Sequence, residues 1–261
     1  MTKISVVCPT YNSENFVEKT LFSVFQQTRL PDELILIDDG SNDSTVSLLR
    51  NLISNYGEHI KCMIIENNHR GPGAARNTGI MAATGDWVAF LDSDDLWYPQ
   101  KLAEAESRLR ECPGVNFLCH NEISKLVSGS EKRLEYDKKY NVTRPLPQQL
   151  FHANLFSTSA VICKRQILVD SNGFDEHLMS AQDYELWLRL SPSINVMFIN
   201  RILGEYVHRS GNITSRNYKN RFKNEVKIAF KHRHLVNRPR LLLRLLRIVI
   251  SFSLQLIRAQ K

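Results

Sequence analysis

The sequence of 261 residues has few cysteines and no long apolar run at its start. Its five cysteines are widely spaced and lie partly inside apolar runs, so we expect neither a disulfide framework nor a zinc site. Met1–Lys3 lead directly into the apolar stretch Ile4–Cys8, which is too short for an export signal. We therefore expect the body of the protein to be cytoplasmic.

Acidic side chains are scarce in the last part of the chain. Residues 201–261 contain 15 lysines and arginines but only two acidic residues, Glu205 and Glu225, whereas the whole chain has a net charge of +7. The first 200 residues are therefore mildly acidic. This asymmetry predicts an acidic body, at residues 1–215, followed by a basic helical extension at residues 216–261.

Short apolar runs alternate with helical patterns over the first hundred residues. This alternation predicts an α/β protein with a Rossmann-like, mixed but mostly parallel sheet flanked by helices. Asp43 and Pro72 stand where a cap and a first-turn proline would favour helix starts. The expected strands are Ile4–Cys8, Glu33–Ile37, Ile60–Ile65 and Trp87–Leu91, and the helices between them are Glu14–Gln27, Ser44–Asn55 and Gly73–Thr84.

The second half of the chain shows a less regular pattern. The segment Ser128–Pro147 is polar and charged, and we expect it to form a mobile excursion. The residues beyond about Asn217 have the pattern of a basic helix. The other expected elements are helices at Gln100–Arg110 and Asp183–Leu190, a strand at Val115–Cys119, and extended segments at Ser159–Cys163, Asn195–Ile199 and Gly204–His208.

Carboxylates follow two of the expected strands and should share one edge of the sheet with the segment Pro9–Asn12. Ligands bind at this edge in open α/β sheets. Clustered carboxylates repel one another unless a cation or ordered donors compensate them, and hard oxygen ligands suit Mg²⁺ or Mn²⁺ bridging to substrate phosphates. Taken singly, Asp43 and Asp95 could instead cap helices and Asp38 could shape a turn. The five carboxylates are Asp38, Asp39, Asp92, Asp94 and Asp95.

Five stretches of the sequence carry a resemblance to one known family, and they occur in that family's order. They are Ser5–Asn12, Ile37–Asp43, Gly71–Gly79, Phe90–Asp95 and Gln182–Leu190. Together they span residues 4 to about 210, and with them the chain resembles the family 2 glycosyltransferases of GT-A architecture. The resemblance implies a nucleotide-sugar-binding half at residues 1–98 and an acceptor-side half at residues 99–215.

The resemblance also implies an activity. It is the inverting transfer of a sugar from a nucleotide-diphosphate sugar, which we expect to be UDP-linked, to a glycan or lipid-linked acceptor in cell-surface polysaccharide synthesis. A non-catalytic glycan-assembly scaffold is the alternative. A nucleotidyltransferase should show a glycine-rich phosphate loop after its first strand, and Pro9–Asn12 offers none.

Residue by residue, the resemblance places the donor nucleotide against the first strand ends. Tyr11 would lie against the base, Asp39 would accept a hydrogen bond from it, and Arg76 would lie nearby. On their own, Tyr11 would be interpreted as a strand-end aromatic and Arg76 as a surface cation paired to an aspartate. The remaining donor-binding residues implied by the resemblance are Pro9, Thr10, Asp92 and Ser93.

The resemblance further implies a metal site and a catalytic base. Asp94, with Asp92 beside it and His208 as a third ligand, would hold the Mn²⁺ or Mg²⁺ that neutralises the leaving diphosphate; a lone histidine is otherwise unremarkable. Because a sugar hydroxyl is a poor nucleophile, attack requires a general base, and Asp183 is the candidate. Asp183 could instead be only a carboxylate at a helix start. Gln182 replaces the family's glutamate, and its lack of charge should lower the pKa of Asp183 relative to a Glu-Asp pair.

The basic extension ends in an amphipathic pattern. Only about ten residues separate Arg247 from Arg258, against the roughly 20 needed to cross a bilayer, so we expect an interfacial helix on an anionic leaflet. Residues 219–258 would make this contact, at the inner face of the cell membrane. Docking against protein is the rival interpretation, and nucleic acid is not expected because no binding motif is present. The polar stripe consists of Arg240, Arg244, Arg247, Ser251, Gln255 and Arg258.

Overall fold

The computed structural model describes residues 2–209 and 218–259. This part of the chain contains a nine-stranded sheet in the order β3-β2-β1-β4-β8-β6-β9-β5, with β7 paired to β6. Strands β1, β2, β3, β4, β6 and β9 run in one direction, so the sheet is mostly parallel, as predicted. The strands are β1 (Ile4–Thr10), β2 (Glu33–Asp38), β3 (Lys61–Glu66), β4 (Trp87–Phe90), β5 (Leu96–Trp97), β6 (Phe117–Lys125), β7 (Glu131–Leu134), β8 (Val161–Lys164) and β9 (Val196–Val207).

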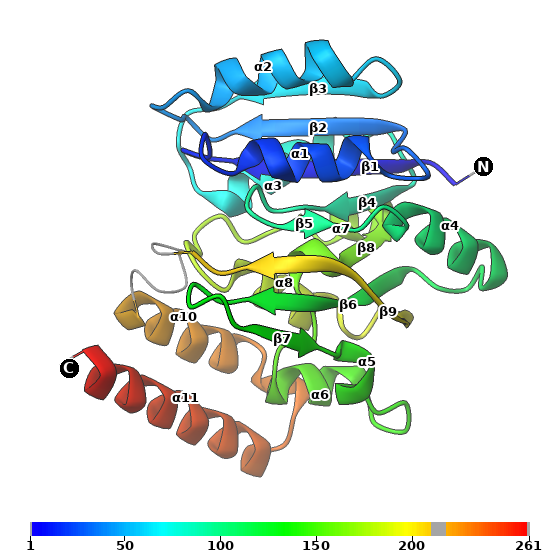
Figure 1. The fold of residues 1–261 in the computed structure, drawn as a ribbon. Helices are drawn as coiled ribbons and strands as arrows, with labels where there is room; N and C mark the ends of the chain where they lie inside the picture. Colours follow the sequence, from blue (N-terminus) through cyan, green and yellow to red (C-terminus); the bar gives the residue numbers. More distant parts are fainter. Residues whose placement is uncertain (1, 210–217, 260–261) are drawn as a thin grey trace.

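Helices cover both faces of this sheet, and each face has its own apolar core (Figure 1). One core joins α1, α2 and α4 to β1 and β2, while the other joins α3, α6 and α8 to the opposite face. The helices are α1 (Val17–Phe25), α2 (Thr45–Tyr56), α3 (Pro72–Ala82), α4 (Lys101–Glu111), α5 (Tyr136–Lys139), α6 (Leu146–His152), α7 (Arg165–Asp170) and α8 (Gln182–Leu190), with a 3-10 turn η1 (Thr158–Ala160).

The predicted elements of the first half are confirmed within a few residues. Strands β1 and β2 are buried at every position, which explains their uninterrupted apolar runs. Pro72 is the first residue of α3. Asp43 stands one residue before the N-cap of α2, yet its Oδ1 accepts hydrogen bonds from the Thr45 amide at 3.0 Å and the Thr45 hydroxyl at 2.5 Å. It therefore supports the helix start that was expected of it.

The expectation of a mobile excursion at Ser128–Pro147 is wrong. The segment contains β7, which pairs antiparallel with β6, followed by α5. Side chains of β6 hold it in place: Asn121 Oδ1 accepts a hydrogen bond from the Tyr136 amide at 2.8 Å, and the Tyr136 hydroxyl donates to Glu122 at 3.0 Å. These partners stand well apart in sequence, so the polar composition of the segment did not reveal them.

The expected pair of extended segments at Asn195–Ile199 and Gly204–His208 is one long strand. Strand β9 runs beside β6 throughout, with register shifts near His120 and Asn121 that absorb the irregular middle of the strand. Gly204 is necessary in this strand because a Cβ there would lie 2.8 Å from the Leu96 carbonyl oxygen of β5.

The C-terminal extension is helical, as predicted. It consists of α10 (Tyr218–Lys231), a 3-10 turn η2 (Arg233–Leu235) and α11 (Arg238–Ala259), and α10 and α11 lie side by side (Figure 1). The predicted boundary between residues 215 and 216 falls outside the described residues. Among the described helices, none is both long enough and apolar enough to cross a bilayer.

Gly79 offers a test of how closely α3 packs on the sheet. A Cβ at this position would lie 2.5 Å from Val7 Cγ1 and 2.7 Å from Ile37 Cδ1. We predict that Gly79→Ala lowers the unfolding free energy by about 1–3 kcal/mol, because the clash outweighs the roughly 0.5–1 kcal/mol that alanine gains in helix propensity. Urea denaturation measures the difference. Met81→Ala, an exposed site on the same helix, should stay within about 0.5 kcal/mol of the wild type, and equal values for both variants would contradict this packing.

Candidate active site

The ends of three parallel strands bring most of the predicted site residues to one rim. Strand β1 lies between β2 and β4, with Thr10 opposite Asp38 and Val7 opposite Phe90. The segments that follow these strands therefore lie at the same edge of the sheet (Figure 1). Pro9 lies within β1 itself, next to Thr10.

Asp38 shapes the turn that follows β2. Its carboxylate accepts hydrogen bonds from the Ser41 amide at 2.8 Å, the Ser41 hydroxyl at 2.5 Å and the Thr10 hydroxyl at 3.2 Å. Asp38 is 2% exposed. Its hydrogen bonds match the turn-forming role that was the alternative interpretation of this residue.

Asp39 holds the turn that precedes α3. Its Oδ1 accepts from the Arg70 amide at 2.9 Å, and its Oδ2 accepts from the Gly71 amide at 2.8 Å and lies 2.8 Å from His69 Nδ1. Gly71 has a φ of 93°, a conformation that glycine adopts without strain. A base contact by Asp39 stays a prediction, and its Oδ1, which accepts one hydrogen bond from the protein, retains lone-pair capacity for it.

Tyr11 forms an aromatic platform with a residue that sequence reasoning missed. Its ring stacks on that of His69, with centroids 4.2 Å apart and planes 22° apart, and Tyr11 is 42% exposed. The stack lies beside Asp39 through the contact of His69 with that carboxylate. An exposed aromatic face next to a hydrogen-bond acceptor suits a nucleobase.

Arg76, which is buried, forms an ion pair at the rim with Asp92, whose side chain is 27% exposed. The Arg76 side chain is 6% exposed, and Nη2 donates to Asp92 Oδ1. Its Nε and Nη1 atoms are buried without a partner among the described residues. Burial lowers the pKa of Arg76, but Asp92, Asp183 and Asp94 together raise it above its usual value. Arg76 is therefore a core cation and not the surface cation that was the alternative interpretation.

Asp94 pairs with a second arginine. Its Oδ2 lies 2.5 Å from Nε of Arg209, whose guanidinium lies 3.8 Å from the centre of the Phe16 ring. Burial and the neighbouring Asp92 raise the pKa of Asp94, and Arg209 opposes them. The sequence did not identify Arg209, because its partner Asp94 lies 115 positions earlier in the chain.

Asp95 and Ser93 tie the acidic turn to the rest of the fold. Asp95 is 1% exposed and accepts from the Ser159 hydroxyl at 2.5 Å and the Val207 amide at 2.9 Å. Ser93 is also buried, with its hydroxyl 2.8 Å from that of Ser13. Neither side chain caps a helix, and both fix the backbone that carries Asp92 and Asp94.

The acidic turn has the chemistry of a divalent-cation site that needs its substrate to be complete. No three metal-type ligands converge among the described residues. Asp92 and Asp94 nevertheless present two hard oxygen ligands, and Mg²⁺ is commonly held by one or two carboxylates together with substrate phosphates. The donor set therefore fits Mn²⁺ or Mg²⁺, with part of the coordination left to a diphosphate and water.

His208 faces another group in this structure. Its Nε2 lies 2.9 Å from the Ser124 hydroxyl, and its ring meets Tyr206 edge-on at 4.7 Å. Metal ligation by His208 stays a prediction. The motif that contains His208 continues beyond Arg209, outside the described residues.

Asp183 lies in the first turn of α8, facing the same rim. Burial raises its pKa, while Arg76 lowers it and Asp92 raises it further. Asn154 Nδ2 lies 3.5 Å from its Oδ2. A carboxylate with a raised pKa is a stronger base than an exposed one, which suits proton abstraction from a hydroxyl. Gln182 is expected to lower the pKa of Asp183 relative to a Glu-Asp pair, and this effect stays a prediction.

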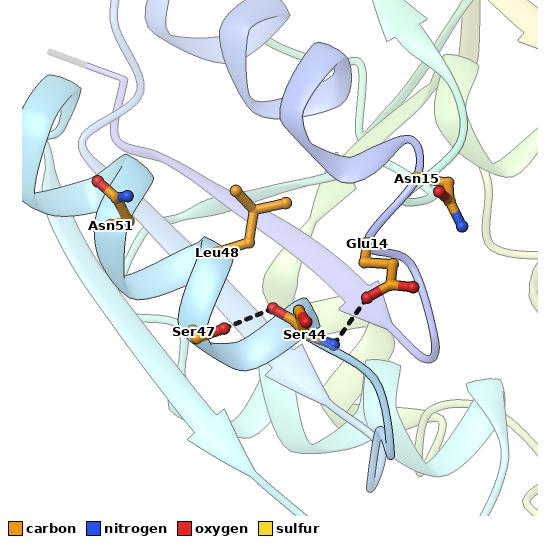
Figure 2. Close-up of a pocket in the computed structure, with 6 residues that line it drawn as sticks. All are labelled: Glu14, Asn15, Ser44, Ser47, Leu48 and Asn51. Carbon is orange, nitrogen blue, oxygen red and sulfur yellow. Dashed lines mark hydrogen bonds between the residues drawn. The ribbon is translucent and has the colours of Figure 1, made fainter.

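A surface hollow of about 460 Å³ lies apart from these residues, between the start of α1 and α2 (Figure 2). Glu14 Oε2 accepts from the Ser44 amide at 2.9 Å at its edge. The residues that line it are Glu14, Asn15, Ser44, Ser47, Leu48 and Asn51. They include none of the predicted site residues, so we assign the hollow no role.

A family model for glycosyl transferase family 2 matches residues 5–168. The chain belongs to this family. An uncharacterised glycosyltransferase of Rickettsia conorii is 31% identical over 212 residues, which are 78% of this chain and 32% of that protein. The amylovoran biosynthesis glycosyltransferase AmsB of Erwinia amylovora is 31% identical over 192 residues, 71% of this chain and 62% of the relative. The chain thus spans less than two thirds of several of the curated relatives it matches.

Other matches extend over more of both partners. WfgD of Escherichia coli, a UDP-Glc:α-D-GlcNAc-diphosphoundecaprenol β-1,3-glucosyltransferase, is 26% identical over 220 residues, covering 83% of this chain and 81% of WfgD. S. aureus TarS 1-349 in complex with UDP-GlcNAc has a TM-score of 0.74 at 22% identity, over 96% of this chain and 73% of TarS. PcManGT from Pyrobaculum calidifontis, in complex with GDP-Man and Mn²⁺, has a TM-score of 0.71 at 20% identity, over 99% of this chain and 75% of PcManGT. These family 2 and structural matches confirm the GT-A architecture.

A buried ionisable network lies beneath the acidic turn. Lys101 is fully buried, and its Nζ donates to the Ser159 carbonyl at 2.6 Å. Glu122 is also fully buried, and burial raises its pKa to about 7. Since Ser159 also bonds Asp95 and accepts from the Asp92 amide at 3.1 Å, this network supports the turn from below.

Glu122 should make stability depend on pH. Its unfolded-state pKa is near 4.5 and its folded-state pKa is about 7. The folded protein keeps this proton longer, so stability is lost as pH rises from about 4.5 to 7. We predict that Glu122→Gln gains on the order of 2 kcal/mol relative to the wild type between pH 5 and pH 8, measured by urea denaturation. The exposed Glu58→Gln variant should show no such gain, and parallel curves for wild type and Glu122→Gln would refute this assignment.

Proposed function

We propose that this protein transfers a sugar, with inversion, from a nucleotide-diphosphate sugar to a saccharide or lipid-linked saccharide acceptor. One observation carries the proposal. The buried guanidinium of Arg76 pairs with Asp92 and interacts electrostatically with both Asp94 and Asp183, which come from separate parts of the chain. The three aspartates proposed for donor binding, metal binding and base catalysis thus all interact with one guanidinium. A scaffold protein would have no need to maintain this arrangement.

Donor binding would use the rim from one side to the other. The Tyr11–His69 platform suits the base, and the positive charge of Arg76 beside Asp92 would favour a diphosphate bound near this pair. A Mn²⁺ or Mg²⁺ held by Asp92 and Asp94 would neutralise the charge that develops on the leaving diphosphate. WfgD, a UDP-Glc-dependent glucosyltransferase, and the TarS complex with UDP-GlcNAc favour a UDP-linked donor, whereas PcManGT is in complex with GDP-Man.

Transfer would need only one base from this chain. Asp183 would take the proton from the acceptor hydroxyl as its oxygen attacks the anomeric carbon opposite the diphosphate, and this direct displacement inverts the configuration. Asp183 is half-buried, and this position would exclude part of the water that competes with the acceptor. The transferred group would be a hexosyl or N-acetylhexosaminyl group, as in the UDP-Glc of WfgD and the UDP-GlcNAc bound to TarS.

Substitution of two aspartates separates donor binding from transfer. Asp94→Ala should abolish the Mn²⁺-dependent thermal stabilisation by UDP-sugars, because the cation loses a ligand. Asp183→Asn should keep that stabilisation and lower turnover by about 10²–10⁴-fold, the usual contribution of a general base. A thermal-shift panel of UDP- and GDP-sugars with and without Mn²⁺, followed by assays of UDP or GDP release, makes both measurements. Full turnover by Asp183→Asn would exclude the proposed base.

A lipid-linked acceptor would place the reaction at a membrane, and α11 presents a surface for one. Leu241, Leu245 and Ile248 of this helix pack on the protein core. Beside them Arg244 pairs with Glu225 at 3.2 Å, and the exposed Arg247 contacts His152. The opposite face is left uncovered, with six apolar side chains between 48% and 66% exposed. These are Leu242, Leu243, Leu246, Val249, Ile250 and Leu254.

We propose that this face lies in the cytoplasmic leaflet, with residues 219–258 contributing basic charge. An apolar helix face flanked by cations suits an anionic bilayer surface. Exposed lysines recur on the neighbouring helix α10 at positions 219, 223 and 227. The acceptor of WfgD, a diphosphoundecaprenol-linked sugar by its name, is of the kind such a surface would hold.

Vesicle flotation tests the membrane assignment. Wild-type protein should float with phosphatidylglycerol-containing vesicles and less so as salt is raised, because charge screening weakens the contact. The double substitution Leu246→Glu/Ile250→Glu should reduce binding at least tenfold, since it places charge in the apolar face. Met81→Glu, another exposed apolar site, should bind like the wild type. If the double variant still floats, this face does not bind lipid. The same holds if the wild type is a stable dimer and the double substitution makes it a monomer.

A further inference from the structure

Helix α8 starts at a strained backbone position next to the proposed base. Ala181, the residue before this helix, has a φ of 58°, in the left-handed region. The other described non-glycine residues with positive φ are Asn12 and Asn172, and asparagine tolerates this conformation better than alanine does. Strain of this kind persists only where the surrounding structure enforces it. Asp183 stands two residues further on, so the conformation of Ala181 sets where its carboxylate points.

Helix α10 holds the chain on both sides of Ala181. On the N-terminal side, Asn224 Nδ2 lies within hydrogen-bond distance of the Ser180 carbonyl, at 3.2 Å, and of the Ser180 hydroxyl, at 3.1 Å. On the C-terminal side, the fully buried Glu185 accepts from Lys231 Nζ at 2.8 Å and from His232 Nε2 at 3.1 Å.

Glu185 has more basic partners than are required to neutralise its charge. Arg189, one turn along α8, already forms an ion pair with it at 3.0 Å. Lys231 and His232 add partners from the C-terminal extension, and Lys231 also reaches Asp175 at 3.2 Å, ahead of Ala181 in the chain. Helix α10 and the residue that follows it are thus bonded to the segment before the strained residue and to the helix after it.

Helix α11 contributes to the same region. The Arg244 guanidinium lies 5.2 Å from the centre of the Tyr184 ring, and Tyr184 follows Asp183 directly. The Tyr184 hydroxyl donates to the Leu150 carbonyl at 3.0 Å, which fixes α8 against α6. Asn154, just beyond α6, lies 3.5 Å from Asp183.

We infer that the C-terminal helix pair is a positioning clamp for the base. In this view Asn224, Lys231 and His232 keep Ala181 in the left-handed conformation and thereby aim Asp183 at the acceptor hydroxyl. They are positioning residues, because they act through Ala181 and Glu185. The inference rests on the proposed function in that it takes Asp183 as the base. It gives the basic extension a role in the chemistry beside its proposed role at the membrane.

Hydrogen exchange tests the clamp without any assay of activity. The Glu185 amide donates to the Ala181 carbonyl at 3.0 Å, so its exchange rate, measured by NMR, reports on this helix start. Asn224→Ala should speed its exchange at least tenfold, and Lys231→Ala should act in the same direction. Lys223→Ala, an exposed site on α10, should leave the rate unchanged. A wild-type rate in both Asn224→Ala and Lys231→Ala would overturn the clamp.

Turnover then tests whether the clamp positions the base. The probe is Mn²⁺-dependent release of UDP from UDP-glucose and UDP-N-acetylglucosamine, with water as acceptor. Asn224→Ala should lower kcat about tenfold while UDP binding, measured by calorimetry, changes less than twofold. A second substitution, Ala181→Gly, should recover at least threefold of the loss, because glycine adopts positive φ without strain. A merely structural role would affect binding and turnover together and would not respond to Ala181→Gly.

The two proposals fail in different ways. If Asn224→Ala accelerates exchange but leaves kcat unchanged, positioning of the base is excluded. If the wild-type protein releases nucleotide from no UDP- or GDP-sugar, the proposed function fails, and the exchange rates alone then decide whether the clamp exists.

Discussion

The ion pair between the buried Arg76 and the partly exposed Asp92 is the constraint on which the site depends. A guanidinium taken out of water is costly unless charges and acceptors surround it, and removing one partner of a buried pair leaves an uncompensated charge. Arg76 stands on α3, and Asp92 follows β4, so the pair fixes helix to sheet at the rim. Its Nε and Nη1 atoms have no partner among the described residues, so the guanidinium depends on Asp92 and the other nearby carboxylates to balance its charge.

The charges at this rim explain why cation and diphosphate should bind together. Asp92 and Asp94 are balanced by Arg76 and Arg209, so the four side chains form a near-neutral set in a largely buried place. A divalent cation alone would add uncompensated positive charge, and a diphosphate alone would add negative charge, each at a desolvation cost. When the divalent cation and the diphosphate bind together, their charges nearly cancel. Arg76 and Arg209 therefore relieve the repulsion between carboxylates that the sequence pattern indicated, and they would make the proposed metal site conditional on the donor.

The sequence predicted what is locally encoded. The runs of β1 and β2 are buried at every residue, so their apolar composition identified them directly, and the parallel order then placed Tyr11, Asp39 and Asp92 at one rim. It could not predict what depends on contacts between distant residues. Asn121 and Glu122 order the segment after β6, His69 stacks on Tyr11 from another loop, and Arg209 reaches Asp94 from 115 positions further along the chain. No periodicity or local spacing records such pairs.

The amphipathic pattern of α11 shows the same limit from the other direction. Its arginine stripe was visible in the sequence, but which face meets the protein was not. In the structure Arg244 turns toward Glu225 and the ring of Tyr184, while the leucine-rich face is left outward. An exposed leucine-rich helix face is unfavourable in water, because burial of that apolar face would be worth roughly 25 cal/mol per Å². Under the proposed membrane contact the arrangement is consistent, since lipid covers this face while Arg244 stays on the side that reaches α8. The same helix can then locate the enzyme at its acceptor and stabilise the helix that carries the base.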